Sequence, residues 1–195
     1  SISKTWRVSS MTRKKLAFDK YKYYEKSVQN AEQEVDFLNE KYSEIRGKNK
    51  KALLFREDFC GTGMVMCEWA KQSAKHFSYG VDLDPEPIEY GKDKHLSKLT
   101  PTEQKRVEYI EENVLNVTAP KVDIQVAFNF SYMIFKKREE LKTYFKAVRQ
   151  SLKSDGVFFL DLLGGPDCQK LMVEETEHKN FSYFWDCQEF NTITN

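Results

Sequence analysis

The stretch LLFREDFCGTGMVMCEWA, residues 53–70, decides the fold class of this chain. It opens with the apolar run 53–55, which is typical of a buried strand, and it closes with a segment of helical character. Between the two lie the carboxylates Glu57 and Asp58 and the loop CGTG at residues 60–63. A buried strand that passes through a glycine turn into a helix is the opening unit of a parallel α/β sheet.

The same alternation continues along the chain. Short apolar runs occupy residues 52–55, 77–83, 106–110, 122–130 and 156–163, with helical stretches between them. This pattern predicts an α/β fold of the Rossmann-like, doubly wound kind, with a mostly parallel sheet and helices on both faces. Asp84 followed by Pro85 marks one of the helix starts, since the side chain can accept a hydrogen bond from the first turn.

The chain outside these runs has a different character. Up to about residue 50 it is polar, and one face of an amphipathic helix is predicted by the apolar positions Tyr24, Val28, Ala31, Val35 and Leu38. After Pro166 we expect a helix near residues 168–175 and then an aromatic strand from residue 181, with no final hairpin. The predicted organisation is a helical cap at residues 1–50, a core at 51–165 and a C-terminal segment at 166–195.

Composition and charge restrict the classes of function. The 195 residues are 40% apolar and carry a net charge of +1, which indicates a folded protein without a global field for nucleic acid or anionic membranes. No apolar run approaches the roughly 20 residues of a membrane-spanning helix. The first residues lack the apolar centre of a signal peptide. We therefore expect a cytoplasmic protein with no membrane or nucleic-acid partner.

Cysteines and histidines do not form a recognisable metal or disulfide pattern. The four cysteines at positions 60, 67, 168 and 187 contain no CxxC pair, and no histidine lies near them at the spacing of metal ligands. We expect reduced thiols and no bound metal.

The loop spacing disfavours a phosphate ligand. Neither G-x-G-x-x-G nor a P-loop is present, because Met64, Val65 and Met66 follow Gly63 directly. In doubly wound sheets the loop after the first strand passes close to the ligand. Carboxylates just before that loop therefore suit a ligand that carries positive charge.

Polar positions also follow the next two strand runs. Asp82 comes 19 residues after Gly63 and just before Leu83, at the strand tip where such folds bind a ribose diol. The alternative is that Asp82 and Asp84 only cap the next helix. Asn113 follows the third run, where its amide and the backbone N–H of Val114 are placed to meet an adenine edge. A turn asparagine is the alternative there.

Together these segments resemble the class I S-adenosylmethionine-dependent methyltransferases. FREDFCGTG is similar to the acidic, glycine-rich first motif of that family, GVDLDPEPIEYG to the segment that follows it, and EENVLNV to the adenine-facing segment. VDIQVAFNFSYMIF and LKSDGVFFLDLLGG resemble its fourth and fifth strand regions. The resemblance covers about residues 51–165, and REDFCGTG looks like a little-characterised bacterial branch.

The resemblance implies S-adenosylmethionine as cofactor and a role for each matching residue. It places Glu57 near the methionine portion, Asp82 on the ribose, Leu83 beside it, and Asn113 and Val114 on the adenine. Gly61, Thr62 and Gly63 match the glycine turn, and Asn129 and Phe130 lie where the fourth strand opens towards cofactor and substrate. One departure is Phe59, which stands where the family usually has its first glycine and must narrow the loop or pack beneath it. Because of this departure, either Glu57 or the next residue, Asp58, can correspond to the acidic position of the family motif, and both are candidates to contact the cofactor. The family also adds two antiparallel strands, so either the aromatic tail supplies one or the chain is a truncated piece that lacks its C-terminal strands.

The acceptor is less well defined than the cofactor. Candidate pocket walls are Tyr24, Tyr132, Met133 and the aromatic segment 181–185, and no general base is identified among the histidines. NFSY at 129–132 resembles the N-P-P-Y segment of some amino-methylating enzymes, without its two prolines.

The balanced charge favours a small-molecule acceptor, methylated by in-line displacement. The main alternative is a regulatory or partner-completed domain that binds S-adenosylmethionine or a nucleoside without methylating anything. An NAD-linked oxidoreductase is disfavoured by the missing third glycine. An RNA-modifying enzyme would use the basic cluster at residues 13–15. The sequence does not determine the acceptor or the oligomeric state.

Overall fold

The computed structural model describes residues 2–5, 19–28 and 30–187. The chain divides into two compact units, one formed by residues 30–161 and the other by the segments up to residue 29 and from residue 162. Each unit is described by itself. Within the described residues, no helix is both long enough and apolar enough to cross a membrane.

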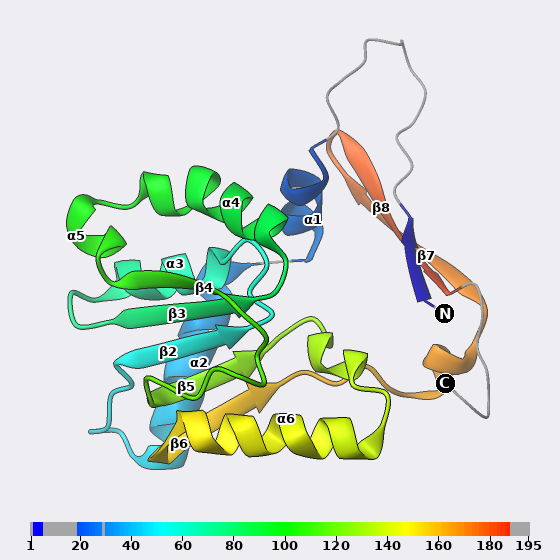
Figure 1. The fold of residues 1–195 in the computed structure, drawn as a ribbon. Coiled ribbons are helices and arrows are strands. Elements are labelled where there is room, and N and C mark those ends of the chain that lie inside the picture. The colour runs from blue at the N-terminus through cyan, green and yellow to red at the C-terminus, as the bar shows by residue number, and fades with distance from the viewer. Residues whose placement is uncertain (1, 6–18, 29, 188–195) are drawn as a thin grey trace. The chain divides into compact units, whose positions relative to one another are not determined.

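The unit of residues 30–161 is built on a five-stranded sheet (Figure 1). Its strands are β2 (Leu54–Asp58), β3 (Phe77–Asp82), β4 (Val107–Glu111), β5 (Val122–Ala127) and β6 (Leu152–Leu160). They lie in the order β4-β3-β2-β5-β6, and each neighbouring pair is parallel. The predicted Rossmann-like parallel sheet is therefore confirmed, with each strand close to its apolar run.

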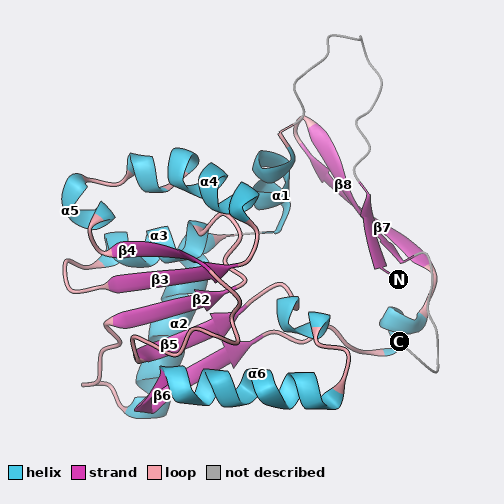
Figure 2. Ribbon diagram, viewed as in Figure 1, coloured by secondary structure: helices cyan, strands magenta, loops and turns pink. Residues whose placement is uncertain are grey.

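Helices cover both faces of this sheet (Figure 2). They are α2 (Ala31–Arg46), α3 (Met64–Gln72), α4 (Pro85–Lys94), α5 (Pro101–Gln104) and α6 (Arg138–Ser151), with short 3₁₀ helices at Leu96–Lys98 and Ser131–Ile134. Apolar side chains of α2 and α3 pack on one face, in a core that contains Leu38, Phe55 and Trp69. Those of α6 pack on the other face, in a core that contains Tyr144 and Val148. The sheet is thus buried on both sides, as its nearly continuous apolar runs require.

Local signals explain where several helices begin and end. Asp84 caps α4, since its Oδ1 accepts a hydrogen bond of 2.9 Å from the backbone N–H of Glu86. Asn30 caps α2 in the same way, through Gln33. This cap separates α2 from α1 (Lys20–Val28), so the apolar positions from Tyr24 to Leu38 lie on two helices and not on the single predicted one. The two helices belong to different units.

A polar network is buried between the sheet and α6. The Asp58 carboxylate accepts hydrogen bonds from Arg56 Nε at 2.7 Å, Gln125 Nε2 at 2.7 Å and the Tyr144 hydroxyl at 2.8 Å. Ser151 Oγ donates in turn to Gln125 Oε1 at 2.6 Å. Asp58 is 1% exposed. A carboxylate at that depth is stable only when its oxygens are paired, and the network supplies the partners.

The second unit holds a separate antiparallel sheet. Its strands β1 (Ile2–Thr5), β7 (Met172–His178) and β8 (Phe181–Cys187) lie in the order β1-β8-β7, and a 3₁₀ helix at Pro166–Gln169 precedes β7. The expected aromatic strand is therefore confirmed as β8, but two other expectations were wrong. Near residues 168–175 only the short 3₁₀ helix is helical and β7 begins at Met172, and β7 and β8 form a hairpin. The strand β7 is rich in Glu, which disfavours strands, yet its backbone pairs with β8 along its whole length.

Replacing Asp58 tests the buried network. We expect Asp58→Ala to destabilise the protein by about 3–5 kcal/mol, because Arg56 would remain buried without its carboxylate. Urea unfolding measures this loss. Glu139→Ala is the matched control, since Glu139 forms an exposed pair with Lys142 at 2.9 Å and should change stability by less than about 0.5 kcal/mol. Equal effects of the two variants would contradict the role given to Asp58.

Candidate active site

The glycine turn after β2 combines close packing with an open side. Gly63 has a φ of +67°, and a Cβ built there would lie 2.6 Å from the Tyr109 hydroxyl, so only glycine fits. Gly61 has a φ of +53°, and a Cβ built there would meet no atom within 4 Å. The Gly63 N–H donates to the Cys60 carbonyl at 2.8 Å, which closes the turn before α3. The backbone at Gly61 therefore borders open space at the carboxyl end of the central strand. Thr62 between them is buried, and its carbonyl accepts a hydrogen bond of 2.8 Å from the Tyr109 hydroxyl.

Phe59 occupies the start of this turn without blocking it. Its φ is +56°, the left-handed conformation that a glycine would adopt at low cost. Its ring lies 5.8 Å from that of Tyr144 and 6.2 Å from that of Phe135. The phenylalanine thus packs beneath the loop, in the core against α6, which is one of the two outcomes expected for it.

Asp82 faces the glycine turn. Its Oδ2 accepts a hydrogen bond of 2.7 Å from the Gly61 N–H, and its Oδ1 accepts one of 2.9 Å from the Asp84 N–H. Capping of α4 is done by Asp84, so the cap does not account for the position of Asp82. Each carboxylate oxygen can accept a second hydrogen bond, which leaves Asp82 with acceptor capacity at the turn. Leu83 next to it is 66% exposed.

The two carboxylates that precede the turn point to opposite faces of the sheet. Asp58 faces α6, where Arg56, Gln125 and Tyr144 engage it. Glu57 is 3% exposed and lies on the other face, where its Oε2 accepts a hydrogen bond of 3.3 Å from the Met66 N–H in the first turn of α3. Since successive strand residues alternate between faces, only Glu57 lies beside the start of α3.

Glu34 on α2 joins Glu57, although the sequence interpretation missed it. Glu34 lies close enough to raise the pKa of Glu57 by charge repulsion. Its Oε2 is buried and accepts no hydrogen bond from any residue that the structure describes. A signal was present in the sequence, because Glu34 falls within the apolar stripe of Ala31, Val35 and Leu38. A carboxylate on the buried face of a helix is costly unless it is paired or hydrogen-bonded, so its presence there indicates a site.

The segment after β4 is held from both sides. Asn113 Oδ1 accepts a hydrogen bond of 2.9 Å from the Leu115 N–H, which is the turn that we weighed as an alternative for this asparagine. Val114 is buried, and its carbonyl accepts a hydrogen bond of 3.3 Å from Arg56 Nη2. The buried network thus also positions the residues expected to meet adenine.

One carboxylate holds the loop after β5. Asn129 and Phe130 have φ values of +55° and +58°, an unusual pair of consecutive left-handed residues without glycine. The N–H of Asn129 donates to Asp161 Oδ2 and that of Phe130 to Oδ1, both at 2.8 Å. Asp161 directly follows β6, so it fastens the tip of one strand to the loop after its neighbour.

The predicted pocket walls lie in different places. Tyr132 is 7% exposed and belongs to the core against α6, and Met133 packs against the same core. Tyr24 lies on α1, in the other unit, so its place in an acceptor pocket stays a prediction. Within the described residues, no three His, Cys, Asp or Glu side chains are grouped to hold a metal ion.

Comparison with known proteins identifies the family. A family model described as a methyltransferase domain matches residues 59–156, which is just over half of the chain. This chain belongs to the methyltransferase-domain family. The match starts at the glycine turn and includes all the strands that follow it as far as the middle of β6. No curated protein matches this methyltransferase.

Solved structures share the fold of this methyltransferase at low sequence identity. An S-adenosylmethionine-dependent methyltransferase from Clostridium acetobutylicum has a TM-score of 0.68 and 22% identity, covering 88% of this chain and 68% of its own. CalS10, an amino pentose methyltransferase from Micromonospora echinaspora solved with its cofactor, has a TM-score of 0.64 and 14% identity over 86% and 67% of the two chains. The glycopeptide N-methyltransferase MtfA, solved with sinefungin, has a TM-score of 0.59 and 11% identity. The match covers 77% of this chain and 57% of the MtfA chain. The fold is that of class I methyltransferases, whose cofactor is S-adenosylmethionine.

The electrostatics of the methyltransferase site fit this cofactor, which carries a sulfonium and an ammonium group. Burial raises the pKa of Glu57 well above its usual range, and the charges of Glu34 and Asp82 raise it further. Burial and the charge of Asp161 raise the pKa of Glu34. The structure pairs Glu57 with no cationic side chain among the described residues, so a bound cation would stabilise its charged form.

The raised pKa of Glu57 predicts a stability that depends on pH. Below the pKa of about 4.3 that Glu57 has in the unfolded chain, the residue is protonated in both the folded and the unfolded state. Its ionisation then takes nothing from the stability of the folded protein. As pH rises through the higher folded pKa, the buried carboxylate must ionise and stability is lost. We therefore expect Glu57→Gln to be more stable than the native protein at pH 7.5 and nearly equal to it at pH 4.5, by urea unfolding. A difference that is the same at both pH values would contradict this assignment.

The Asp161 hydrogen bonds can be tested in the cofactor-free protein. In Asp161→Asn the side-chain nitrogen cannot accept, so either Asn129 or Phe130 loses its partner. We expect at least one of these two amides to exchange its hydrogen about tenfold faster, as the loss of about 1–2 kcal/mol implies. Asp155→Asn is the control, because Asp155 forms an exposed pair with Lys50 at 3.4 Å, away from this loop. Unchanged exchange at both amides would show that the loop holds its shape without Asp161.

Proposed function

We propose that this methyltransferase transfers a methyl group from S-adenosylmethionine to a small-molecule acceptor by in-line displacement. The observation that carries the proposal is the hydrogen bond from the Gly61 N–H to Asp82, beside the buried Glu57 and the open side of the turn. The bond holds the Asp82 carboxylate beside open space, which supports a role for its oxygens in accepting hydrogen bonds from a ribose. Glu57 adds negative charge for a cation nearby.

Each group has a role in binding the cofactor under this proposal. Asp82 accepts hydrogen bonds from the ribose hydroxyls, and Glu57 with Glu34 offsets the positive charge of the methionine portion. The remaining contacts come from the backbone of the turn and from the ends of the neighbouring strands, at Gly61, Thr62, Gly63, Leu83, Asn113, Val114, Asn129 and Phe130. Asp58 is left out of this set, since its oxygens serve the buried network.

When bound, S-adenosylmethionine supplies a methyl group that its sulfonium sulfur already activates towards nucleophiles. The residues of this chain then have to orient the acceptor and exclude water. Asp161 supports this by holding Asn129 and Phe130 in one conformation at the strand end where an acceptor would enter. A rigid loop increases the fraction of time in which the acceptor atom is aligned with the bond between the methyl group and the sulfur.

A small-molecule acceptor agrees with the surface of the chain. The net charge of +1 provides no steering field for nucleic acid. Ile134, just after the loop that Asp161 holds, and Leu83 are 67% and 66% exposed and offer apolar surface at the ends of β5 and β3. Two of the structural relatives act on an amino pentose and on a glycopeptide nitrogen, which supports acceptors of modest size.

The proposed ribose contact is tested by comparing two neighbouring carboxylates. We expect Asp82→Ala to weaken S-adenosylmethionine binding by roughly 10- to 100-fold, since hydrogen bonds to a charged group are lost. Asp84→Ala removes a helix cap nearby and should leave affinity within about threefold while lowering stability by about 1 kcal/mol. Isothermal titration calorimetry measures both affinities. Equal losses in the two variants would mean that Asp82 acts only through the shape of the loop.

A turnover assay separates the proposal from its main alternative. The native protein is incubated with S-adenosylmethionine and a panel of small amines and hydroxyl compounds, and S-adenosylhomocysteine is quantified. Release that depends on one class of acceptor supports a methyltransferase for small molecules. Tight binding without release from any acceptor would favour a cofactor-binding regulatory or partner-completed domain.

A further inference from the structure

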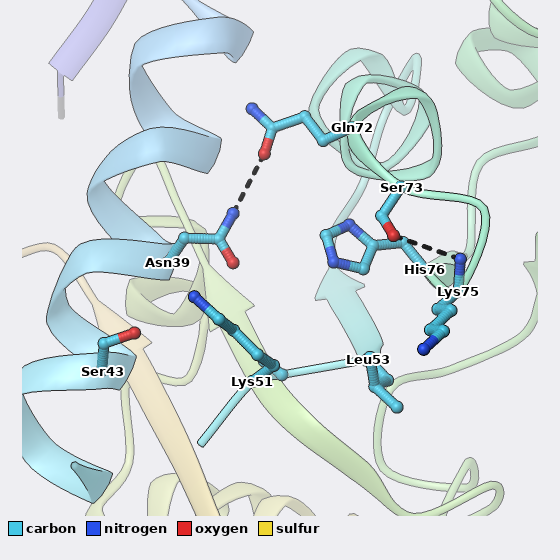
Figure 3. Close-up of a pocket in the computed structure, with 9 residues that line it drawn as sticks. Asn39, Ser43, Lys51, Leu53, Gln72, Ser73, Lys75 and His76 are labelled. Carbon is cyan, nitrogen blue, oxygen red and sulfur yellow. Dashed lines mark hydrogen bonds between the residues drawn. The ribbon is translucent and has the colours of Figure 1, made fainter. Parts of the chain in front are cut away.

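A cavity lies at the opposite end of the strands from the glycine turn. It has a volume of about 530 Å³ and is bordered by α2, by the residues that lead into β2 and by the turn between α3 and β3 (Figure 3). We call it the amino-edge cavity; its polar lining includes Asn39, Ser43, Lys51, Ser73, Lys75 and His76. Because the strands are parallel, their amino ends and carboxyl ends lie on opposite edges of the sheet. The cavity is therefore separate from the site proposed for the cofactor.

The walls of the cavity are held by hydrogen bonds. Arg106 Nη1 donates to the carbonyls of Ala70, Ser73 and His76 at 2.6–2.7 Å, which fastens the turn between α3 and β3. On the opposite wall, Asn39 Nδ2 donates to Gln72 Oε1 at 3.0 Å and joins α2 to α3 (Figure 3). A cavity with walls fixed in advance loses little conformational entropy when a ligand binds.

The charge of the lining favours an anion. Lys51 and Lys75 form no ion pair with any residue in the described part of the chain, and the Arg106 guanidinium lies behind the turn. No lining residue is a carboxylate. Two carboxylates bind lining residues and are already engaged. Asp36 Oδ1 accepts a hydrogen bond of 2.9 Å from Gln72 Nε2, and Asp123 accepts one of 2.9 Å from the Leu53 N–H while it pairs with Lys153. Lysines act as point charges that suit phosphate, whereas paired carboxylate recognition usually uses the fork of an arginine.

Two groups in the cavity, the His76 ring and the Asn39 amide, are left with only a hydrogen-bond acceptor for a ligand. His76 Nδ1 lies 3.0 Å from the Trp69 carbonyl and therefore donates to it, which leaves Nε2 as an acceptor in the neutral ring. Burial lowers the pKa of His76 and keeps the ring neutral at pH 7. The Asn39 side-chain N–H groups donate to the backbone carbonyl of Val35 and to the side-chain Oε1 of Gln72. The Oδ1 atom of Asn39 therefore remains to accept a hydrogen bond from a ligand. A ligand that satisfies these groups must carry hydrogen-bond donors as well as negative charge.

We propose that the amino-edge cavity binds a small organic phosphate that also carries hydroxyl groups, such as a phosphorylated sugar. Lys51, whose side chain reaches towards Asn39 and Ser43 of α2, binds the phosphate, and Lys75, whose side chain extends towards Leu53, adds positive charge to the lining (Figure 3). The hydroxyl groups donate to Asn39 and His76. The volume of the cavity falls in the range of known small-molecule sites, about 300–1,000 Å³.

Adjacent lysines provide the test of this proposal. The probe is ribose 5-phosphate, titrated by calorimetry into the native protein, Lys51→Ala and Lys50→Ala. Lys50 lies outside the cavity and pairs with Asp155, so the two variants lose the same charge at neighbouring positions. We expect Lys51→Ala to weaken binding about tenfold or more and Lys50→Ala to stay within about twofold. Equal weakening by both variants, or no binding to the native protein at 10 mM probe, overturns the proposal.

Three further probes separate the chemistry of the ligand. Ribose without phosphate should not bind, because it carries no negative charge for the lysines. Inorganic phosphate should bind more weakly than ribose 5-phosphate, because it cannot contact the lysines and also donate hydroxyl hydrogen bonds to Asn39 and His76. Citrate that binds as tightly as ribose 5-phosphate overturns the assignment to phosphate. These titrations need no S-adenosylmethionine, so their outcome is independent of the proposed methyl transfer. Unchanged urea unfolding of Lys51→Ala confirms that the exposed lysine has no structural role.

Discussion

The buried carboxylate of Asp58 determines how the central strand ends are arranged. It binds Arg56 on its own strand, Gln125 on β5 and Tyr144 on α6. Arg56 extends the network to the backbone carbonyls of Val114 and of Val117 after β4. A charge removed from water is stable only with such partners, so these elements must meet at the end of β2. The glycine turn begins at the next residue, so the network around Asp58 also fixes where the turn starts.

Two neighbouring carboxylates on β2 thus have opposite chemical surroundings. Asp58 has a permanent cation and two neutral donors, whereas Glu57 has one backbone donor and the repulsion of Glu34 and Asp82. In the first arrangement the partners offset part of the cost of burial, which still raises the pKa of Asp58. The second is unfavourable in the free protein, because burial and like charges both oppose ionisation. Unfavourable electrostatics of this kind are typical of a binding site, and under the proposed function the cation of the cofactor offsets them.

Prediction from the sequence succeeded where local periodicity decides the structure. The segment MVMCEWAKQ coincides with α3, and the apolar runs mark β2 to β6, because strands covered on both faces need continuous apolar residues. It failed in the C-terminal segment, where Glu174, Glu175 and Glu177 on β7 argue against a strand. Pairing with β8 outweighs that preference. It also missed the break between α1 and α2, since the apolar spacing runs on across the cap at Asn30.

The sequence by itself determined the order of strands and helices between residues 51 and 160, the glycine turn, and the acidic residue that ends the second strand of the core, Asp82. These follow from spacing and from the conformational freedom of glycine, which are local properties. Only the tertiary structure decided which of Glu57 and Asp58 faces the core against α6, that Glu34 joins Glu57, and that Asp161 holds the loop at Asn129. Those arrangements bring together residues far apart in the chain. Their physical cause is the packing of α2 and α6 on opposite faces of one sheet, which no local pattern contains.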